Sequence, residues 1–205
     1  MTVPFMVADP ATPKECALPR VPEIQPALLE SCIAGNPTAI QAFVQHHQRL
    51  VFAFLTRLLG TDSAIEDLAQ EVFVRALRAL PRFDVRGPAR VSTWLLTIAS
   101  RLVLDEKRRA PQVSMILELD ATASMPVDSP ERIQHRRELA AALGKAVRTL
   151  SPDQREAFIL AEVHGLTMDE LAEVTRVAVG TAKARLSRAR ERLREALGPL
   201  WEEMQ

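Results

Sequence analysis

Residues 165–197, GLTMDELAEVTRVAVGTAKARLSRARERLREAL, predict a short helix, a tight turn and a second helix whose charge is almost all of one sign. Between residues 176 and 194 there are seven Lys or Arg and a single acid, Glu191, although the chain as a whole has a formal net charge of zero. Such a local excess of positive charge indicates that a polyanion binds there.

The last helix is expected to begin after Gly180, with Thr181 as its cap. Apolar residues at helical spacing mark its buried side: Ala182, Leu186, Ala189, Leu193 and Leu197. Opposite them lies a crest of Ala184, Ser187 and Glu191, flanked by two basic shoulders: Lys183, Arg190 and Arg194 on one side, Arg185, Arg188 and Arg192 on the other. A crest of this kind suits a helix that enters the major groove of DNA, where the shoulders meet phosphates.

The composition of the whole chain favours an all-α protein. Tyr is absent, Gly is scarce with 7 in 205 residues, and Ala, Leu, Arg and Glu dominate, which suits helices and leaves few of the residues that strands prefer. No apolar run approaches the roughly 18 residues that span a bilayer, so we expect a cytoplasmic protein without direct membrane insertion. Cys16 and Cys32 have no zinc-type neighbours and are expected to be free thiols.

Two helical regions separated by a linker are expected. Residues 1–26 are rich in proline and predict a mobile tail, and residues 111–130 lose helical periodicity and predict a flexible linker. The two remaining regions, 27–110 and 131–205, are the expected domains. Capping boxes mark three of their helix starts, at residues 63–66, 151–154 and 167–170.

The helix expected from Ser63 to Leu80 has a polar side with an apolar residue at its centre. Ile65, Leu68, Ala69, Val72, Phe73, Ala76 and Leu80 make up the buried side. The polar side carries Asp67, Gln70, Glu71 and Arg78, with Val74 among them. From this helix alone, an ordinary exposed valine is favoured over a protein contact.

The helix expected over residues 92–109 places Trp94 away from its apolar side, in a row with Thr97, Arg101, Asp105 and Arg108. An indole beside arginines can stack on unpaired bases. Packing of Trp94 against a neighbouring helix is equally compatible with the pattern. In the long helix before it, His46 and His47 are interpreted as surface or edge residues and not as metal ligands, because no other metal-binding type shares their spacing.

Three segments in register resemble the extracytoplasmic function (ECF) sigma factors of bacterial RNA polymerase, over about residues 27–198. EDLAQEVFVRALRALPRFD (66–84) resembles the polymerase-binding helix of the family, and STWLLTIASRLVLDEKRR (92–109) its segment that reads the −10 element. LSPDQREAFILAEVHGLTMDELAE followed by VGTAKARLSRARERLRE resembles its −35 reading domain. The implied fold is a sigma-2-like helical bundle joined by the linker to a sigma-4-like helix-turn-helix domain.

The resemblance implies a role for individual residues. The polymerase-binding positions are Asp67, Gln70, Glu71 and Val74. The positions that meet the melted −10 strand are Trp94, Ser100, Arg101, Asp105, Arg108 and Arg109. Those that meet −35 bases are Lys183, Ala184, Ser187 and Arg188, with Thr181 and Arg185 on phosphates. Two departures from the family stand out: Arg101 replaces a common Asn, and Arg176 replaces the usual leucine-glycine of the turn.

The implied function is promoter-specific initiation with core RNA polymerase, without catalysis, metal, cofactor or small-molecule substrate, and under control of an anti-sigma factor. A helix-turn-helix regulator that acts without polymerase is the first alternative, but the segments at 66–84 and 92–109 have no role in it. A recombinase-type enzyme is the second. It needs a nucleophile or a metal-binding carboxylate cluster, and neither stands out in the sequence.

Overall fold

The computed structural model describes residues 22, 24–60, 64–85, 87, 89–109 and 130–203. Within these ranges every regular element is a helix, as the composition predicts. The expected tail, apart from its last residues, and the expected linker up to residue 129 lie outside the described residues.

The first two helices, α1 (Pro26–Ile33) and α2 (Pro37–Leu59), are separated at the predicted break. Gly35 takes a φ of 78° there, a left-handed conformation that glycine tolerates best. The side chain of Asn36 then caps α2 by accepting hydrogen bonds from the backbone N–H groups of Thr38 and Ala39. The break between α1 and α2 is therefore determined by the residues within it, Gly35 and Asn36.

The interpretation of His47 as a surface or edge residue is wrong. His47 is 1% exposed, and its ring lies between those of Phe43 and His46. It belongs to the helical row of Phe43, Val51 and Phe54, which is the buried side of α2. Its Nδ1 is within 3.0 Å of the carbonyl oxygen of Phe43, so the buried ring keeps a polar partner.

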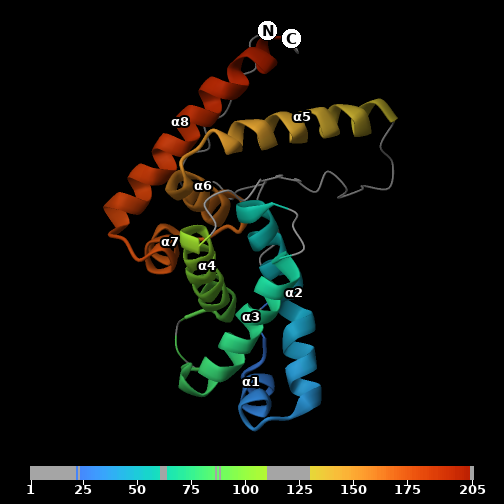
Figure 1. Cartoon of the computed structure of the whole chain (residues 1–205), viewed down its shortest axis with the longest axis vertical. Coiled ribbons are helices and arrows are strands. Elements are labelled where there is room, and N and C mark those ends of the chain that lie inside the picture. Colours follow the sequence, from blue (N-terminus) through green and yellow to red (C-terminus); the bar gives the residue numbers. More distant parts are fainter. Residues whose placement is uncertain are drawn as a thin grey trace.

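The next elements are α3 (Ala64–Ala79), the short 3₁₀ helix η1 (Leu80–Arg82) and α4 (Val91–Arg109). The expected cap of α3, Ser63, lies outside the described residues. The predicted apolar side of α3 is confirmed for Ile65, Ala69, Val72, Phe73 and Ala76, all of which are buried. The helices α2, α3 and α4 pack on one another and with α1 form the lower part of the molecule in Figure 1.

The C-terminal half contains α5, α6, a π-helical segment η2, α7 and α8, which span Pro130–Arg148, Pro152–Phe158, Ile159–Val163, Met168–Thr175 and Val179–Glu203. Both predicted capping boxes in this half are present: Ser151 with Gln154 at α6, and Thr167 with Glu170 at α7. The guanidinium of Arg155 donates hydrogen bonds to carbonyl groups at the end of α5, which fixes the angle between α5 and α6.

The start of α8 corrects one expectation. The helix begins at Val179, and the backbone N–H groups of Thr181 and Ala182 both donate to the carbonyl of Ala178, so Thr181 lies inside the first turn and is not the cap. Arg176, which ends α7, takes φ 54° and ψ 45°, the left-handed conformation that usually selects glycine.

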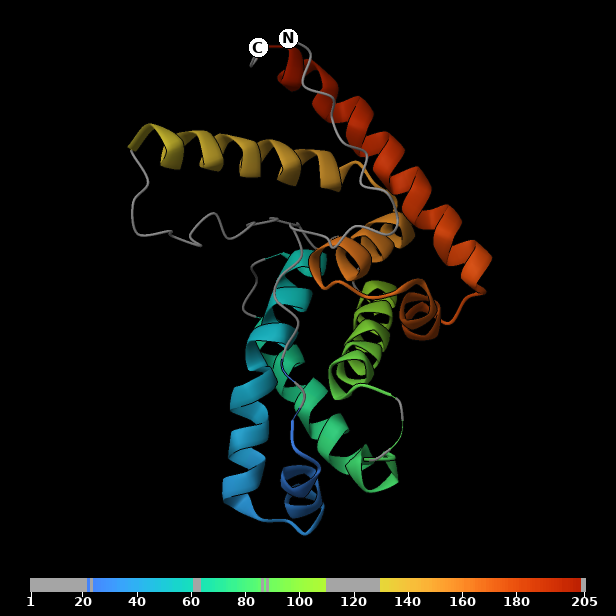
Figure 2. The same cartoon turned by 180° about the vertical axis from the view of Figure 1, so that it is seen from behind.

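The two halves share one hydrophobic core. Buried side chains of α2 and α4 form a single cluster with those of η2 and α7, while Ala146, Val147, Leu150, Ala189 and Leu193 form a smaller cluster between α5 and α8. α7 lies beside α4 in both views of the molecule (Figures 1 and 2). None of the described helices has a stretch both long and apolar enough for a bilayer span.

Candidate polymerase and DNA interfaces

The polar side of α3 faces solvent. Asp67, Gln70 and Val74 are exposed, the last by 38% of its surface. Glu71 pairs with Arg75 one turn later at 2.6 Å, and both side chains remain nearly half exposed. The sequence therefore placed these four side chains on an accessible face, where a protein partner can reach acidic groups around an apolar centre.

The position of Trp94 is compatible with both interpretations that the sequence left open, packing against a neighbouring segment and stacking on an unpaired base. Its ring packs against that of Phe83 with centroids 4.8 Å apart, so it is held by a neighbouring segment, yet it remains half-buried. It also lines a hollow of about 410 Å³ together with Arg82, Arg90 and Thr93. Aromatic faces beside guanidinium groups bind unstacked bases and their phosphates.

Trp94 is the one residue lining this hollow that the sequence predicted as a site residue; the aromatic and basic residues beside it, Arg82, Phe83 and Arg90, were not predicted. They lie in η1 and in the segment that leads into α4. The signal in the sequence was PRFDVRGPAR (81–90), which places aromatic and basic residues directly ahead of Trp94. This pattern is not periodic, so a helical wheel does not reveal it.

The other expected −10 residues are not equally accessible. Arg101 and Asp105 are exposed, whereas Ser100 is only 1% exposed and donates a hydrogen bond to Glu156 of α6 at 2.5 Å. Burial lowers the pKa of Arg101, and the positive charge of Arg176 lowers it further. The side chains of Arg108 and Arg109 lie outside the described ones.

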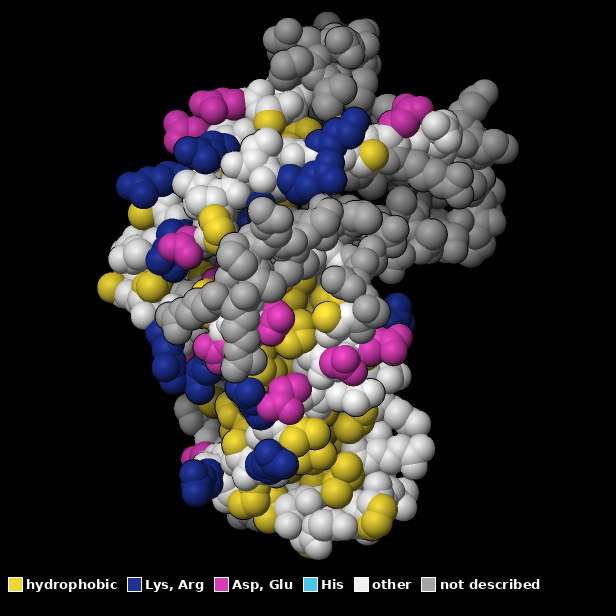
Figure 3. Space-filling model, viewed as in Figure 1, with side chains coloured by type: hydrophobic (Ala, Val, Ile, Leu, Met, Phe, Trp, Pro, Cys, Tyr) yellow, Lys and Arg dark blue, Asp and Glu magenta, His cyan; other side chains and the backbone are white. Residues whose placement is uncertain are grey.

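The face of α8 matches its predicted layout. The apolar side is buried at Ala182, Leu186, Ala189 and Leu193, and Ser187 and Glu191 of the crest are exposed. Ala184, the remaining crest residue, is partly exposed. Basic side chains recur along α8 at the upper left of Figure 3. The helix thus presents small side chains between cations, an arrangement that is compatible with a helix in the major groove.

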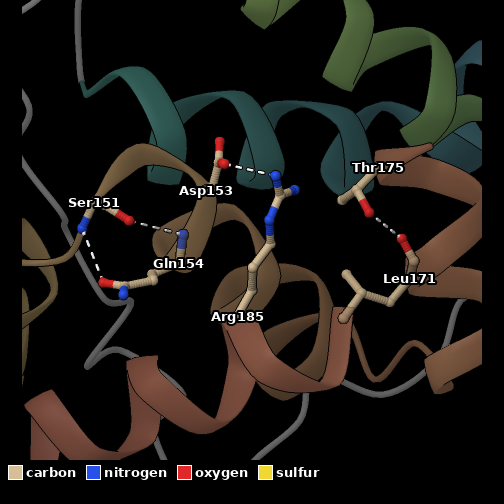
Figure 4. A network of polar contacts seen from close by, with 6 residues as sticks. All are labelled: Ser151, Asp153, Gln154, Leu171, Thr175 and Arg185. Atoms are coloured by element: carbon tan, nitrogen blue, oxygen red, sulfur yellow. Dashed lines mark hydrogen bonds and ion pairs between the residues drawn. The ribbon is translucent and has the colours of Figure 1, made fainter. Parts of the chain in front are cut away.

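Two of the shoulder arginines are engaged inside the protein. Arg185 pairs with Asp153 of α6 at 2.6 Å (Figure 4), and Arg190 pairs with Glu162 of η2 at 2.5 Å. These pairs hold α8 against α6 and η2. Lys183 and Arg188, the expected base-reading cations, are exposed.

Comparison with known proteins identifies one family region in each half of the chain. Residues 43–111 match the family described as Sigma-70 region 2, and residues 140–193 match the one described as Sigma-70, region 4. The chain is 33% identical over 185 residues to the RNA polymerase sigma-H factor of Pseudomonas aeruginosa, covering 86% of this chain and 95% of that protein. It is 35% identical over 170 residues to the ECF RNA polymerase sigma factor SigC of Mycobacterium tuberculosis, covering 82% and 88%.

The chain belongs to the ECF group of the sigma-70 family. A solved structure of the sigma factor RpoE in complex with the anti-sigma factor NepR from Bartonella quintana is similar, with a TM-score of 0.60, 26% identity and coverage of 77% of this chain and 98% of that one. The fold is also that of CnrH, solved in complex with the cytosolic domain of CnrY, at a TM-score of 0.59 and 24% identity over 85% of this chain and 97% of that one.

The sigma-factor assignment orders the sites along the chain. Region 2 contains the exposed face of α3 and most of the lining of the hollow at Trp94, to which Glu170 and Glu173 of region 4 also contribute, and region 4 contains the crest of α8. As in the sequence-based expectation, the polymerase and −10 candidates precede the −35 candidates. Among the described residues, no group of three or more His, Cys, Asp or Glu is placed to hold a metal ion.

Proposed function

We propose that this sigma factor recruits core RNA polymerase through the exposed face of α3 and directs it to promoters by two DNA contacts. α8 binds the −35 duplex with its crest in the major groove, and α4 with the hollow at Trp94 binds the melted −10 strand. The observation that carries the proposal is the occurrence of both sigma regions in one chain, each with the expected polar or basic face.

The individual roles follow from chemistry. Lys183 and Arg188 read −35 base edges from the exposed side of α8, since basic side chains donate to guanine acceptors in the major groove. Trp94 stacks on an unpaired base, while Arg82 and Arg90 at the same hollow contact the adjacent phosphates. The protein itself performs no catalysis, because all of these contacts bind and orient.

The proposal includes an anti-sigma factor as regulator and a cytoplasmic location. The similar RpoE structure was solved with its anti-sigma factor NepR, which supports a partner of that type here. A location alongside polymerase follows from the proposed role.

Run-off transcription with core polymerase tests the function. Promoter-specific transcripts are expected when the protein is added to core enzyme with templates that carry −35 and −10 elements of the family type. A helix-turn-helix regulator that acts without polymerase predicts instead no co-elution with core enzyme in the absence of DNA. The proposal fails if neither co-elution nor specific transcripts occur over a panel of such promoters.

A further inference from the structure

Each basic shoulder of α8 contributes an arginine to an ion pair within the protein. Arg185 and Arg190 belong to opposite shoulders, because residues five positions apart on a helix are separated by about 140°. Arg185 pairs with Asp153 of α6 (Figure 4), and Arg190 pairs with Glu162 of η2 through both Nε and Nη2. The two pairs thus lie on either side of the buried apolar face that α8 packs against α6.

The carboxylates that hold these arginines lie on well-anchored backbone. Asp153 is in the first turn of α6, two positions after its cap, Ser151, which forms a capping box with Gln154 (Figure 4). The guanidinium of Arg155 ties the same turn to three carbonyl groups around the end of α5. Glu162 lies in η2, which continues α6 without a break. The two acids therefore restrain α8 from fixed positions.

The ion pairs limit rotation of α8 about its own axis. Half of its apolar face is alanine: the buried residues are Ala182, Leu186, Ala189 and Leu193. Alanine side chains make few contacts and resist rotation weakly. An ion pair on each side opposes rotation in both directions, because turning the helix either way lengthens one of the pairs. The crest of Ala184 and Ser187 therefore keeps one direction relative to α6.

The ion pairs also withhold two cations from DNA. A carboxylate and a phosphate compete for the same guanidinium group, since both accept charge-assisted hydrogen bonds from it. Asp153 and Glu162 satisfy two arginines inside the protein, whereas the exposed Lys183 and Arg188 have no ion pair within the part of the chain that the structure describes. This arrangement differs from the role on phosphates that the resemblance implied for Arg185.

We propose that Asp153 and Glu162 are positioning residues that determine the specificity of −35 recognition without contacting the bases themselves. By holding Arg185 and Arg190 they fix the direction of the crest and withhold cations that bind any phosphate backbone. Charge contacts to phosphate raise the affinity for all sequences, so withholding them leaves discrimination to the base contacts. The inference rests on the proposed function, because it takes the crest of α8 to be the −35 reading surface.

The test removes one carboxylate at a time. Asp153→Asn and Glu162→Gln keep the size of the side chain but release the arginine that it holds. Asp169→Asn is the matched control, because it removes the same charge from an exposed position in the first turn of α7 that has no ion pair with a described residue of α8. Asp153→Glu retains a carboxylate for Arg185 and should behave as the wild type. Circular dichroism and urea midpoints check that every variant keeps its fold.

The measurement uses the holoenzyme formed by the full chain and core polymerase. Fluorescence anisotropy gives its affinity for the −35 duplex that the wild type prefers in a library and for a scrambled duplex of the same length. Asp153→Asn should bind the scrambled duplex about threefold more tightly than Asp169→Asn, because the released guanidinium joins the contacts to phosphate. The slope of log K against log salt should steepen by about 0.9 on that duplex.

On the preferred −35 duplex this gain should be absent. An arginine that is released to phosphate lets α8 turn away from the direction in which its crest meets the bases, so base contacts are lost as phosphate contacts are gained. The ratio of the two affinities should fall about threefold with Asp153→Asn or Glu162→Gln and about tenfold with both, since the two pairs share no residue. Equal ratios for Asp153→Asn and Asp169→Asn, or an equal loss of affinity for both duplexes, would overturn the proposal.

A second comparison determines whether the effect passes through the arginine. In an Arg185→Gln background, Asp153→Asn should no longer tighten binding to the scrambled duplex, because the cation that it releases is gone. An undiminished gain in that background refutes the role of the pair.

Failure of the proposed function gives a different result. In that case the wild-type holoenzyme does not distinguish between −35 duplexes and forms no promoter-specific transcript, so both proposals fail before any variant is compared. Failure of this inference alone leaves transcripts and discrimination intact in the wild type and unchanged in Asp153→Asn. The wild-type measurement therefore separates the two outcomes.

Discussion

Acidification should open the contact between the two domains through His164. Its side chain is 7% exposed, and neither ring nitrogen has a hydrogen-bond partner within the part of the chain that the structure describes. Burial, and to a lesser degree the positive charge of Arg57, lower the pKa of His164 from 6.5 to about 3. Both Arg57 and the ring partner Phe54 belong to α2, so the environment that lowers this pKa includes the opposite domain.

The direction and size of the effect follow from linkage. Because the pKa is depressed in the closed form, in which the two domains are in contact, the closed form favours neutral His164 and its stability is full above pH 6.5. The stability decreases as the pH falls from 6.5 toward 3, below which His164 is protonated in both forms. At pH 5.5, one unit below the ordinary value, the loss is about 1.4 kcal/mol, or about tenfold in the closed-to-open ratio.

The charged groups around His164 do not offset this loss. From α2, Arg57 opposes a positive imidazole. The carboxylates on the other neighbouring elements are bonded to other groups: Glu156 to Ser100, Glu162 to Arg190, and Glu170 to Thr93 and Thr167. The free-energy cost of a buried, protonated His164 is therefore expected to be removed only by exposing its side chain to water.

Spin labels at Gln48→Cys in α2 and Glu195→Cys in α8, both exposed positions, report the distance between the domains. Its distribution, recorded by double electron–electron resonance between pH 7.5 and 5.5, measures the effect directly. His164→Phe keeps a ring against Phe54 but does not titrate, so it should remain closed over this range and isolate His164 from the other histidines. Urea midpoints at both pH values give the loss of stability for comparison. An identical pH response of the variant and the wild type would refute the reasoning.

Three further predictions concern single side chains. Arg176→Gly should be about 1 kcal/mol more stable than Arg176→Ala, with a Tm about 2–4 °C higher, because glycine adopts the left-handed conformation without the strain of a Cβ; both variants lose the charge that acts on Arg101, so equal stabilities of the two would contradict the strain argument. Glu71→Arg should abolish co-elution with core polymerase while far-UV circular dichroism stays unchanged, and intact co-elution would remove Glu71 from the interface. Arg188→Ala and Lys183→Ala should change −35 base preference by about 1–3 kcal/mol at one position, whereas Arg192→Ala should weaken all sequences alike, as comparison of binding over a −35 library will show.

The helices were predictable because their signals are local. Ser151 with Gln154 and Thr167 with Glu170 form their capping boxes between residues three positions apart, and both are confirmed by hydrogen bonds. Boundaries were less certain where no side chain caps the helix: α8 begins at Val179, ahead of Gly180, because the carbonyl of Ala178 accepts the first bonds. Glycine is tolerated at the start of a helix, so Gly180 was a poor marker of where α8 begins.

The candidate sites were predictable only as faces of single helices. The polar side of α3 and the crest of α8 depend on periodicity within one element, and the structure presents both to solvent. The cover over Ser100 depends on Glu156, far away in the sequence, and no periodicity within α4 reports it. His47 shows the converse error: it was interpreted as a surface or edge residue because no metal-binding residue shares its spacing, although its spacing from Phe43 and Val51 already placed it in the core.

The difference in accessibility between the two candidate DNA surfaces implies an order of events, because α6 and α7 contact α4. Ser187 and Arg188 on α8 are exposed in the closed arrangement, whereas Ser100 on α4 is buried. Contact with duplex −35 DNA therefore needs no separation of the domains, but capture of the −10 strand does. Separation also exposes the apolar side chains that η2 and α7 share with α2 and α4. Because that burial stabilises the closed form, the energy for opening has to come from binding polymerase, and the free protein is expected to bind duplex −35 DNA more readily than single-stranded −10 DNA.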